Sequence, residues 1–140
     1  MVRHLRRAFT LVEILIVVVI LGILAAVVVP QFARAVGDSS ETATFDQLSR
    51  VRRALSYYYA TNSGAYPTVT AGDGTWGPLL PVYMREQPKN FWVPPAASKV
   101  IVLSNAADSG YVTDHGWVYN SATGEVWAAG FDAFDNAYPR

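Results

Sequence analysis

The feature that most constrains this chain is an apolar run near its N-terminus. From Ile14 to Val29 every residue except Gly22 is Ala, Val, Ile or Leu. About 20 apolar residues form a helix long enough to cross the hydrocarbon core of a bilayer. The sequence therefore predicts a membrane-spanning helix, and it leaves the following residues to build whatever lies outside the bilayer.

One carboxylate, that of Glu13, lies at the start of this run. An unpaired charge in a bilayer costs on the order of 2–3 kcal/mol near the centre and less near an end. A residue kept against that cost predicts a partner for its charge. Glu13 is therefore the first candidate for a functional residue.

Three arginines, Arg3, Arg6 and Arg7, precede the run. By the positive-inside rule this end stays in the cytoplasm, and the chain after Val29 lies on the far side of the membrane. A conventional secretory signal peptide and an uncleaved signal anchor are the alternatives. The run is longer than the 7–15 apolar residues of a signal peptide, and a plain anchor does not account for Glu13.

The rest of the chain is mildly acidic. Without the three leader arginines, 8 basic residues face 11 acidic ones, a net charge of −3. This balance argues against nucleic-acid binding as the main function, although Arg50, Arg52 and Arg53 form one basic cluster in the sequence. The chain has no cysteine, which excludes disulfides and Cys-based metal sites. It also lacks the common hydrolase, metalloprotease and phosphate-loop motifs, so we do not expect an enzyme.

The segment Arg6-Arg7-Ala8-Phe9-Thr10-Leu11-Val12-Glu13 resembles the class III signal of type IV pilins and type II secretion pseudopilins. The resemblance implies cleavage between Ala8 and Phe9 by a prepilin peptidase, followed by N-methylation of Phe9. It also implies that Glu13, the fifth residue after the cut, serves subunit assembly by neutralising the Phe9 amine of a neighbouring subunit. The chain departs from the family at Ala8, where most members have glycine.

Gly22 and Pro30 match positions at which pilin-like helices often carry a helix break. Glycine weakens a helix by about 1 kcal/mol relative to alanine, and proline removes a backbone donor. The resemblance implies that the segment between them can unwind when subunits pack in a filament. The alternative is a kink without functional consequence.

Beyond Pro30 the apolar residues recur at spacings of three to four, at Phe45, Leu48, Val51 and Leu55, which predicts that the helix continues. Asp46 and Arg50 stand at i, i+4 on its polar side. Asn62-Ser63-Gly64 ends this pattern.

Strand-like runs follow at 99–103, 116–120 and 125–128, and the last two flank a four-residue hairpin loop with glycine. Four aspartates, Asp108, Asp114, Asp132 and Asp135, lie in this C-terminal part, and His115 is expected to be structural or exposed.

These features predict an α+β fold. A long N-terminal α-helix, transmembrane in its first half, packs against a small antiparallel β-sheet head, as the pilin-like resemblance also implies. The expected organisation is a leader peptide, a transmembrane and filament-core helix, an amphipathic half of the same helix and a globular head, at residues 1–8, 9–30, 31–62 and 63–140 respectively.

The function that the resemblance implies is that of a structural subunit, cleaved, N-methylated and polymerised into a type IV pilus or a type II secretion pseudopilus. It would start in the inner membrane with a cytoplasmic N-terminus and end in an extracytoplasmic filament. Its partners would be further copies, the prepilin peptidase, an inner-membrane platform protein and an assembly ATPase. No cofactor is expected, and calcium held by the C-terminal aspartates is the alternative. The rival function is an uncleaved, membrane-anchored binding module with an aromatic-rich head.

Overall fold

The structure is a computed structural model that describes residues 9–72 and 74–140. The leader 1–8, and with it Ala8 of the expected cleavage site, lies outside the described residues. By compactness the chain divides into two units, Met1–Val36 and Gly37–Arg140. Each unit is described by itself below.

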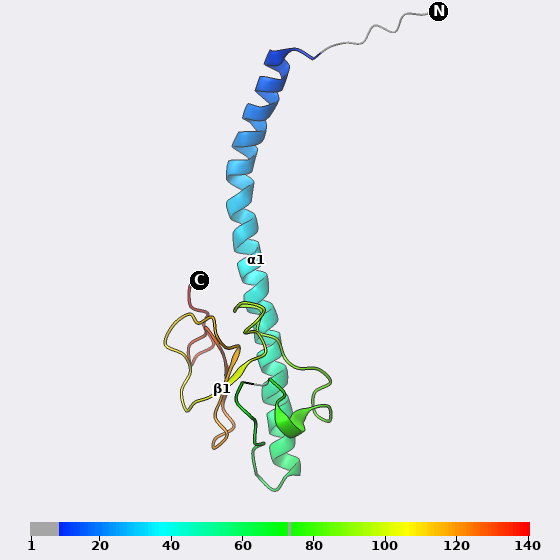
Figure 1. Ribbon diagram of the computed structural model, residues 1–140, viewed down its shortest axis with the longest axis vertical. Helices are drawn as coiled ribbons and strands as arrows, with labels where there is room; N and C mark the ends of the chain where they lie inside the picture. Colours follow the sequence, from blue (N-terminus) through cyan, green and yellow to red (C-terminus); the bar gives the residue numbers. More distant parts are fainter. Residues whose placement is uncertain (1–8, 73) are drawn as a thin grey trace, which may run out of the picture. The chain divides into compact units, whose positions relative to one another are not determined.

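The first unit is the beginning of helix α1, which spans Leu11–Thr61 (Figure 1). The helix contains a stretch long and apolar enough to cross a membrane, and none of that stretch is buried by the chain. From Phe9 to Val36, every large apolar side chain is at least 42 % exposed. An apolar surface of this length is unstable in water, so it requires lipid or protein around it.

Helix α1 runs without interruption through Gly22 and Pro30. Neither residue breaks the helix in the single chain. A Cβ added at Gly22 would meet no atom within 4 Å. The glycine is therefore not required by packing inside the chain, and unwinding between the two residues in a filament stays a prediction.

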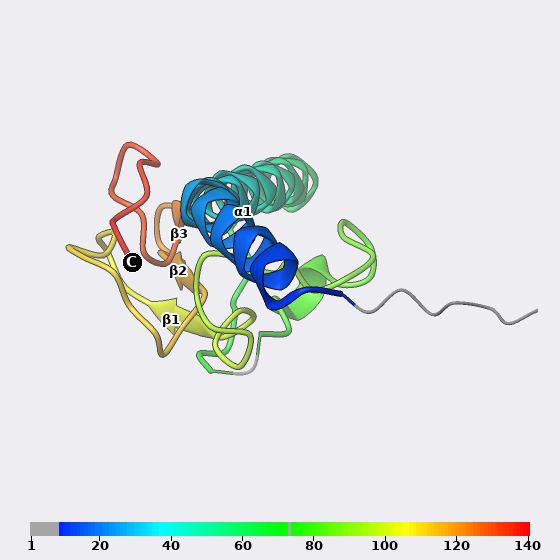
Figure 2. The same cartoon turned by 90° about the horizontal axis from the view of Figure 1, so that it is seen from above.

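In the second unit the last part of α1 packs against the head (Figure 2). The buried residues of this helix are Thr44, Leu48, Val51, Ala54 and Leu55. Their spacing of three to four confirms the predicted apolar stripe. Phe45, also expected in the stripe, is 45 % exposed, and the buried position next to it belongs to a polar residue.

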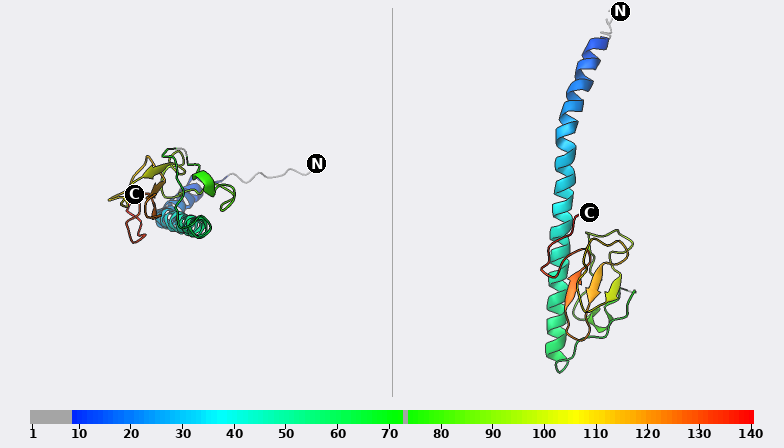
Figure 3. Two further views of the ribbon diagram at one scale, coloured as in Figure 1. Left: turned by 90° about the horizontal axis from the view of Figure 1, so that it is seen from below. Right: turned by 90° about the vertical axis from the view of Figure 1, so that its left-hand side faces the viewer.

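The head contains a three-stranded sheet of β1 (Ile101–Leu103), β2 (Trp117–Tyr119) and β3 (Val126–Ala128), in that order. Strand β3 lies nearest α1 and β1 farthest from it (Figures 2 and 3). A short 3-10 helix, Gly77–Leu79, precedes the sheet.

The sheet is mixed, so the expectation of antiparallel strands throughout was wrong for β1. Strands β2 and β3 form the expected antiparallel hairpin, with Val118 opposite Trp127. Strand β1 instead pairs with β2 in parallel, with Val102 opposite Val118. Parallel neighbours need a crossover of a dozen or more residues, and the irregular segment 104–116 provides it.

Aromatic side chains fill the core of the head. Trp76 packs edge-on against both Trp117 and Tyr119, with ring centroids 6.2 and 5.8 Å apart. Two of the three polar ends are satisfied by backbone: the Tyr119 hydroxyl donates to the Pro67 carbonyl at 3.0 Å, and Trp117 Nε1 donates to the Pro88 carbonyl at 3.2 Å. The third, Trp76 Nε1, is buried without a hydrogen-bond partner among the described residues. Large aromatic rings therefore replace a Leu- and Ile-rich core.

Candidate functional site

Glu13 lies in the first turn of α1 and closes a capping box with Thr10. Thr10 directly precedes the helix, and Glu13 is its third helical residue. The Thr10 backbone N–H and hydroxyl both donate to Glu13 Oε2 at 2.8 Å, while the Glu13 N–H donates to Thr10 Oγ1 at 3.2 Å. This reciprocal arrangement satisfies backbone donors that a helix start otherwise leaves without partners.

The carboxylate therefore has a partner inside its own chain, whereas the sequence suggested only one outside it. A negative charge in the first turn also interacts favourably with the helix dipole. Both bonds from Thr10 go to Oε2, and within residues 9–72 and 74–140 no donor reaches Oε1. Glu13 can thus cap its helix and still accept a cation from another molecule.

Thr10 is the residue that sequence reasoning missed. The signal was present, because a threonine three residues before a glutamate at the start of an apolar run is the pattern of a capping box. Phe9, the expected methylation site, comes immediately before the cap and is 79 % exposed. Most of its surface is therefore open to lipid or to another molecule.

The three arginines near residue 50 do not form one cluster. Arg52 forms a bidentate ion pair with Asp135, at 2.6 and 2.8 Å, and donates to the Val126 carbonyl at 3.1 Å. Arg50 pairs with Asp46 one turn earlier at 2.8 Å, in an exposed position. Arg53 donates to the Ser49 carbonyl of its own helix at 3.3 Å and, with Arg50, lines a groove away from Arg52.

The four C-terminal aspartates have separate roles. Asp108 and Asp114 lie on either side of the buried His115 ring, with O–N distances of 3.2 and 2.7 Å. The hydrogen bond to His115 lowers the pKa of Asp114. Asp135 pairs with Arg52. Asp132 closes the loop that follows it.

The Asp132 carboxylate accepts hydrogen bonds from the Asn136 side chain and from the backbone of Phe134 and Asn136, and these bonds lower its pKa. Across the part of the chain that the structure describes, no three His, Asp or Glu side chains converge as metal ligands would.

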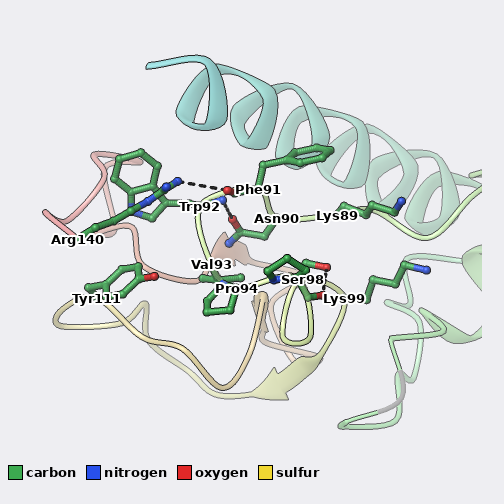
Figure 4. A pocket seen from close by; sticks show the side chains of 11 residues that line it. Lys89, Asn90, Phe91, Trp92, Val93, Pro94, Ser98, Lys99, Tyr111 and Arg140 are labelled. Carbon is green, nitrogen blue, oxygen red and sulfur yellow. Dashed lines mark hydrogen bonds between the residues drawn. The ribbon is translucent and has the colours of Figure 1, made fainter. Parts of the chain in front are cut away.

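Two cavities are among those that the described residues form on the head. One, of about 600 Å³, is lined by Trp92, Tyr111 and Arg140 among others (Figure 4). The Arg140 guanidinium stacks over the Trp92 ring at 3.9 Å and donates to the Phe91 carbonyl at 3.2 Å. The ring face that a ligand would stack on is thus already covered by the chain itself.

The second cavity, of about 690 Å³, is a groove between α1 and residues 83–91. Four cationic side chains and several aromatic or apolar ones line it.

Comparison with known proteins places the similarity in the N-terminal half. Residues 3–29 match the family model of the prokaryotic N-terminal methylation motif. This motif is the one that prepilin-type signals carry, and it includes Phe9, Thr10 and Glu13. The match confirms the resemblance first seen in residues 6–13.

Relatives of two kinds match the chain. It is 42 % identical over 72 residues to the type II secretion system core protein G of Pseudomonas aeruginosa, covering 51 % of this chain and 50 % of that protein. It is 34 % identical over 74 residues to fimbrial protein EcpC of Eikenella corrodens, covering 53 % and 48 %. It is 36 % identical over 53 residues to the type IV major fimbrial protein FimA of Dichelobacter nodosus, covering 38 % and 34 %.

The chain spans about half the length of the first two relatives and about a third of the last. No solved structure shows significant similarity to it. The homologues are thus pseudopilin-type and fimbrial proteins.

Proposed function

We propose that this chain is a prepilin-type structural subunit that is processed at its N-terminus and polymerises into a filament, either a type IV pilus or a type II secretion pseudopilus. The observation that carries the proposal is the first unit of the structure. It is an apolar helix exposed on all sides, it starts with the Thr10–Glu13 cap, and it lies within a methylation motif. Lipid would cover this helix in the precursor, and other copies of the chain would cover it in the filament.

In this proposal the basic leader holds the N-terminus in the cytoplasm, and prepilin peptidase cuts between Ala8 and Phe9. The new amine is methylated and retains its positive charge. Glu13 Oε1 then accepts this amine from a neighbouring subunit, and charge-assisted hydrogen bonds of this kind strengthen when water is excluded. A platform protein and an assembly ATPase of the inner membrane would drive the polymerisation.

The cap defines what Glu13 contributes. Because Oε2 is bound to Thr10, the carboxylate is held in one orientation before a partner arrives. Pre-organisation reduces the entropy lost when the neighbouring amine binds. The same contacts keep the helix intact up to its first residue, next to the amine that cleavage would create.

Mass spectrometry of the intact protein, taken from the membranes and filaments of its native host, tests the proposal. The expected species begins at Phe9 and carries one additional methyl group. A chain that begins at Met1 would support the rival function of an anchored binding module. A chain that begins beyond Ala25 would indicate a conventional signal peptide, and either result would overturn the filament function.

A further inference from the structure

Phe134 is the most exposed of the large apolar side chains in the described part of the molecule, at 86 %. It stands on a short loop of residues 131–137, called the Phe134 loop below. Single exposed apolar residues are common on protein surfaces. What distinguishes this one is the number of contacts that hold its loop in place.

The Phe134 loop is closed by an isolated β-bridge between Phe131 and Ala137. Within it the Asp132 carboxylate accepts the Phe134 N–H at 2.8 Å and the Asn136 N–H at 2.9 Å. Asp135 adopts a left-handed φ of 65° and forms an ion pair with Arg52 of α1. The loop thus presents an aromatic ring to solvent in one conformation, as a binding anchor requires.

A matching surface exists on the same unit, in the cavity of about 690 Å³ between α1 and residues 83–91, called the Arg53 groove below. Its apolar lining includes Tyr57, Met84 and Phe91. Its charged lining is four cations and one carboxylate, namely Arg50, Arg53, Arg85, Lys89 and Glu86. Only Arg50 among these cations has an ion pair with a described residue.

Charge makes the loop and the groove complementary. Phe134 lies between Asp135, whose charge is already paired with Arg52, and Asp132, whose carboxylate accepts only hydrogen bonds, so Asp132 is the carboxylate beside the ring that can face a partner's cations. The wider segment 104–140 carries five acidic residues and one basic residue, a net charge of −4. A basic groove with an apolar floor suits an acidic loop with an aromatic tip.

The loop cannot reach the groove of its own molecule. At 100° per residue, Arg52, which holds the loop, lies about 160° around α1 from Arg50, which lines the groove. Figures 2 and 3 show the C-terminal loop segment and residues 83–91 on different sides of this part of α1. A contact between the two surfaces therefore joins two copies head to tail, and such a heterologous contact propagates into an open chain rather than closing a dimer.

We propose that the Phe134 loop of one copy docks in the Arg53 groove of the next copy. This contact rests on the proposed filament function and adds to it a specific junction between heads. Phe134 contacts the apolar lining of the groove beside Tyr57 and Phe91, while Asp132 faces the cationic side chains that line it. The occupant of the groove is a second copy of this chain.

The absence of native cysteine allows a direct test by cross-linking in the full-length protein. Ala133→Cys places a thiol beside Phe134 and leaves the ring intact, and Glu86→Cys places one at the groove. In cells that assemble filaments, oxidation of the double variant should give a ladder of dimers, trimers and longer species. Each single variant should remain monomeric. The matched control combines Glu86→Cys with Ser121→Cys, an exposed position in the β2–β3 turn, and should give no ladder.

A second variant tests the anchor itself. Phe134→Ala should lower the filament yield about ten-fold or more, as expected for an interface anchor. Its thermal melting should match the unmodified protein, because the ring is exposed and supports no core. The control Leu103→Ala removes an apolar side chain that is half-exposed elsewhere on the head, and it should leave the filament yield unchanged.

The outcomes separate the two proposals. Normal filaments without a ladder would overturn the docking contact and leave the filament function standing. Dimers of Ala133→Cys alone, or a cross-link from Glu86→Cys to a different protein, would overturn it as well, since the groove or the loop would then have another occupant. A chain that is neither processed at Phe9 nor assembled would overturn the filament function, and the docking contact with it.

Discussion

At the scale of single residues, polar side chains decide how this molecule is organised. Asn90 is fully buried. Its Oδ1 accepts the Trp92 N–H at 2.7 Å and the Thr44 hydroxyl at 3.3 Å, and its Nδ2 donates to the carbonyls of Gly116 and Ala129, both at 2.9 Å. The Asn90 side chain thus joins helix α1, the loop that follows residue 90, the segment just before β2 and the segment just after β3.

Glu13 caps its helix through Thr10 and, in the proposed filament, neutralises the amine of a neighbouring subunit. A pair of variants can separate these two roles. Glu13→Gln keeps an oxygen for the Thr10 cap but removes the charge, whereas Glu13→Leu removes both. We expect both variants to insert in the membrane and to be cleaved, and both to assemble poorly, because the amine of a neighbour needs the charge. Filament yield and N-terminal mass measure the two steps.

Thr10→Val is the matched control, since it removes the two hydroxyl hydrogen bonds of the cap and keeps the charge and the backbone hydrogen bond to Glu13. It should reduce the yield much less than Glu13→Gln. Normal assembly of Glu13→Gln would show that the cap, rather than the charge, is what Glu13 provides.

Asp132 makes the stability of the head depend on pH. The side-chain hydrogen bond from Asn136, followed by backbone bonds, lowers the pKa of Asp132 in the folded state. A lowered pKa contributes stability above the unfolded-state value of about 3.9, and this contribution is lost as the pH falls through the folded-state pKa. Asn136→Ala should therefore lower the melting temperature near pH 6 and have little effect near pH 2. An equal effect at both pH values would contradict this role.

At the scale of elements, helix α1 organises the head through residues on different faces. Its apolar stripe packs into the core, while Arg52 holds the C-terminal loop from a second face and Arg50 lines the groove from a third. The i, i+4 pair of Asp46 and Arg50 was evident from the sequence, and the structure confirms it at 2.8 Å. The partner of Arg52 lies 83 residues away, beyond the reach of any local pattern.

The link between α1 and the Phe134 loop predicts a measurable difference between arginines. Arg52→Lys loses the bidentate geometry with Asp135, whose side chain is only 16 % exposed. We expect a loss of about 1 kcal/mol in the free energy of unfolding, kept small by solvent around Arg52. The control Arg50→Lys changes an exposed pair and should cost less than about 0.5 kcal/mol. Equal losses in denaturant titrations of the two variants would contradict the structural role of Arg52.

At the scale of the whole molecule, the division at Gly37 separates an apolar helix that needs lipid or protein around it from a unit that has its own hydrophobic core. Every buried residue of the described chain lies between Thr44 and Phe131. The second unit therefore contains the interactions that a stable domain needs.

A chain that begins at Gly37 should accordingly be soluble and monomeric, and it should unfold cooperatively. Size-exclusion chromatography and thermal melting followed by near-UV circular dichroism measure both properties. The full-length chain in detergent is the control and should melt at a similar temperature. Aggregation, or a melt without a transition, would show that the first unit is needed for folding.

The sequence by itself determined the features that depend on neighbours along the chain. The apolar run predicts the helix, the stripe at spacings of three to four predicts which face is buried, and the glycine-containing turn predicts the β2–β3 hairpin. The capping box of Thr10 and Glu13 was also within reach of the sequence. These features rest on backbone periodicity and short-range hydrogen bonds.

Only the tertiary structure decided the contacts between distant segments. It paired β1 with β2 in parallel, gave Asn90 its four partners, separated Arg52 from Arg50 and Arg53, and placed the Phe134 loop and the Arg53 groove on different sides of α1. Such contacts depend on how loops of irregular conformation return to the helix, and no repeating pattern encodes that path. The apolar run thus predicts a helix that needs lipid or protein around it, while the folded head determines which surfaces it can present to other molecules.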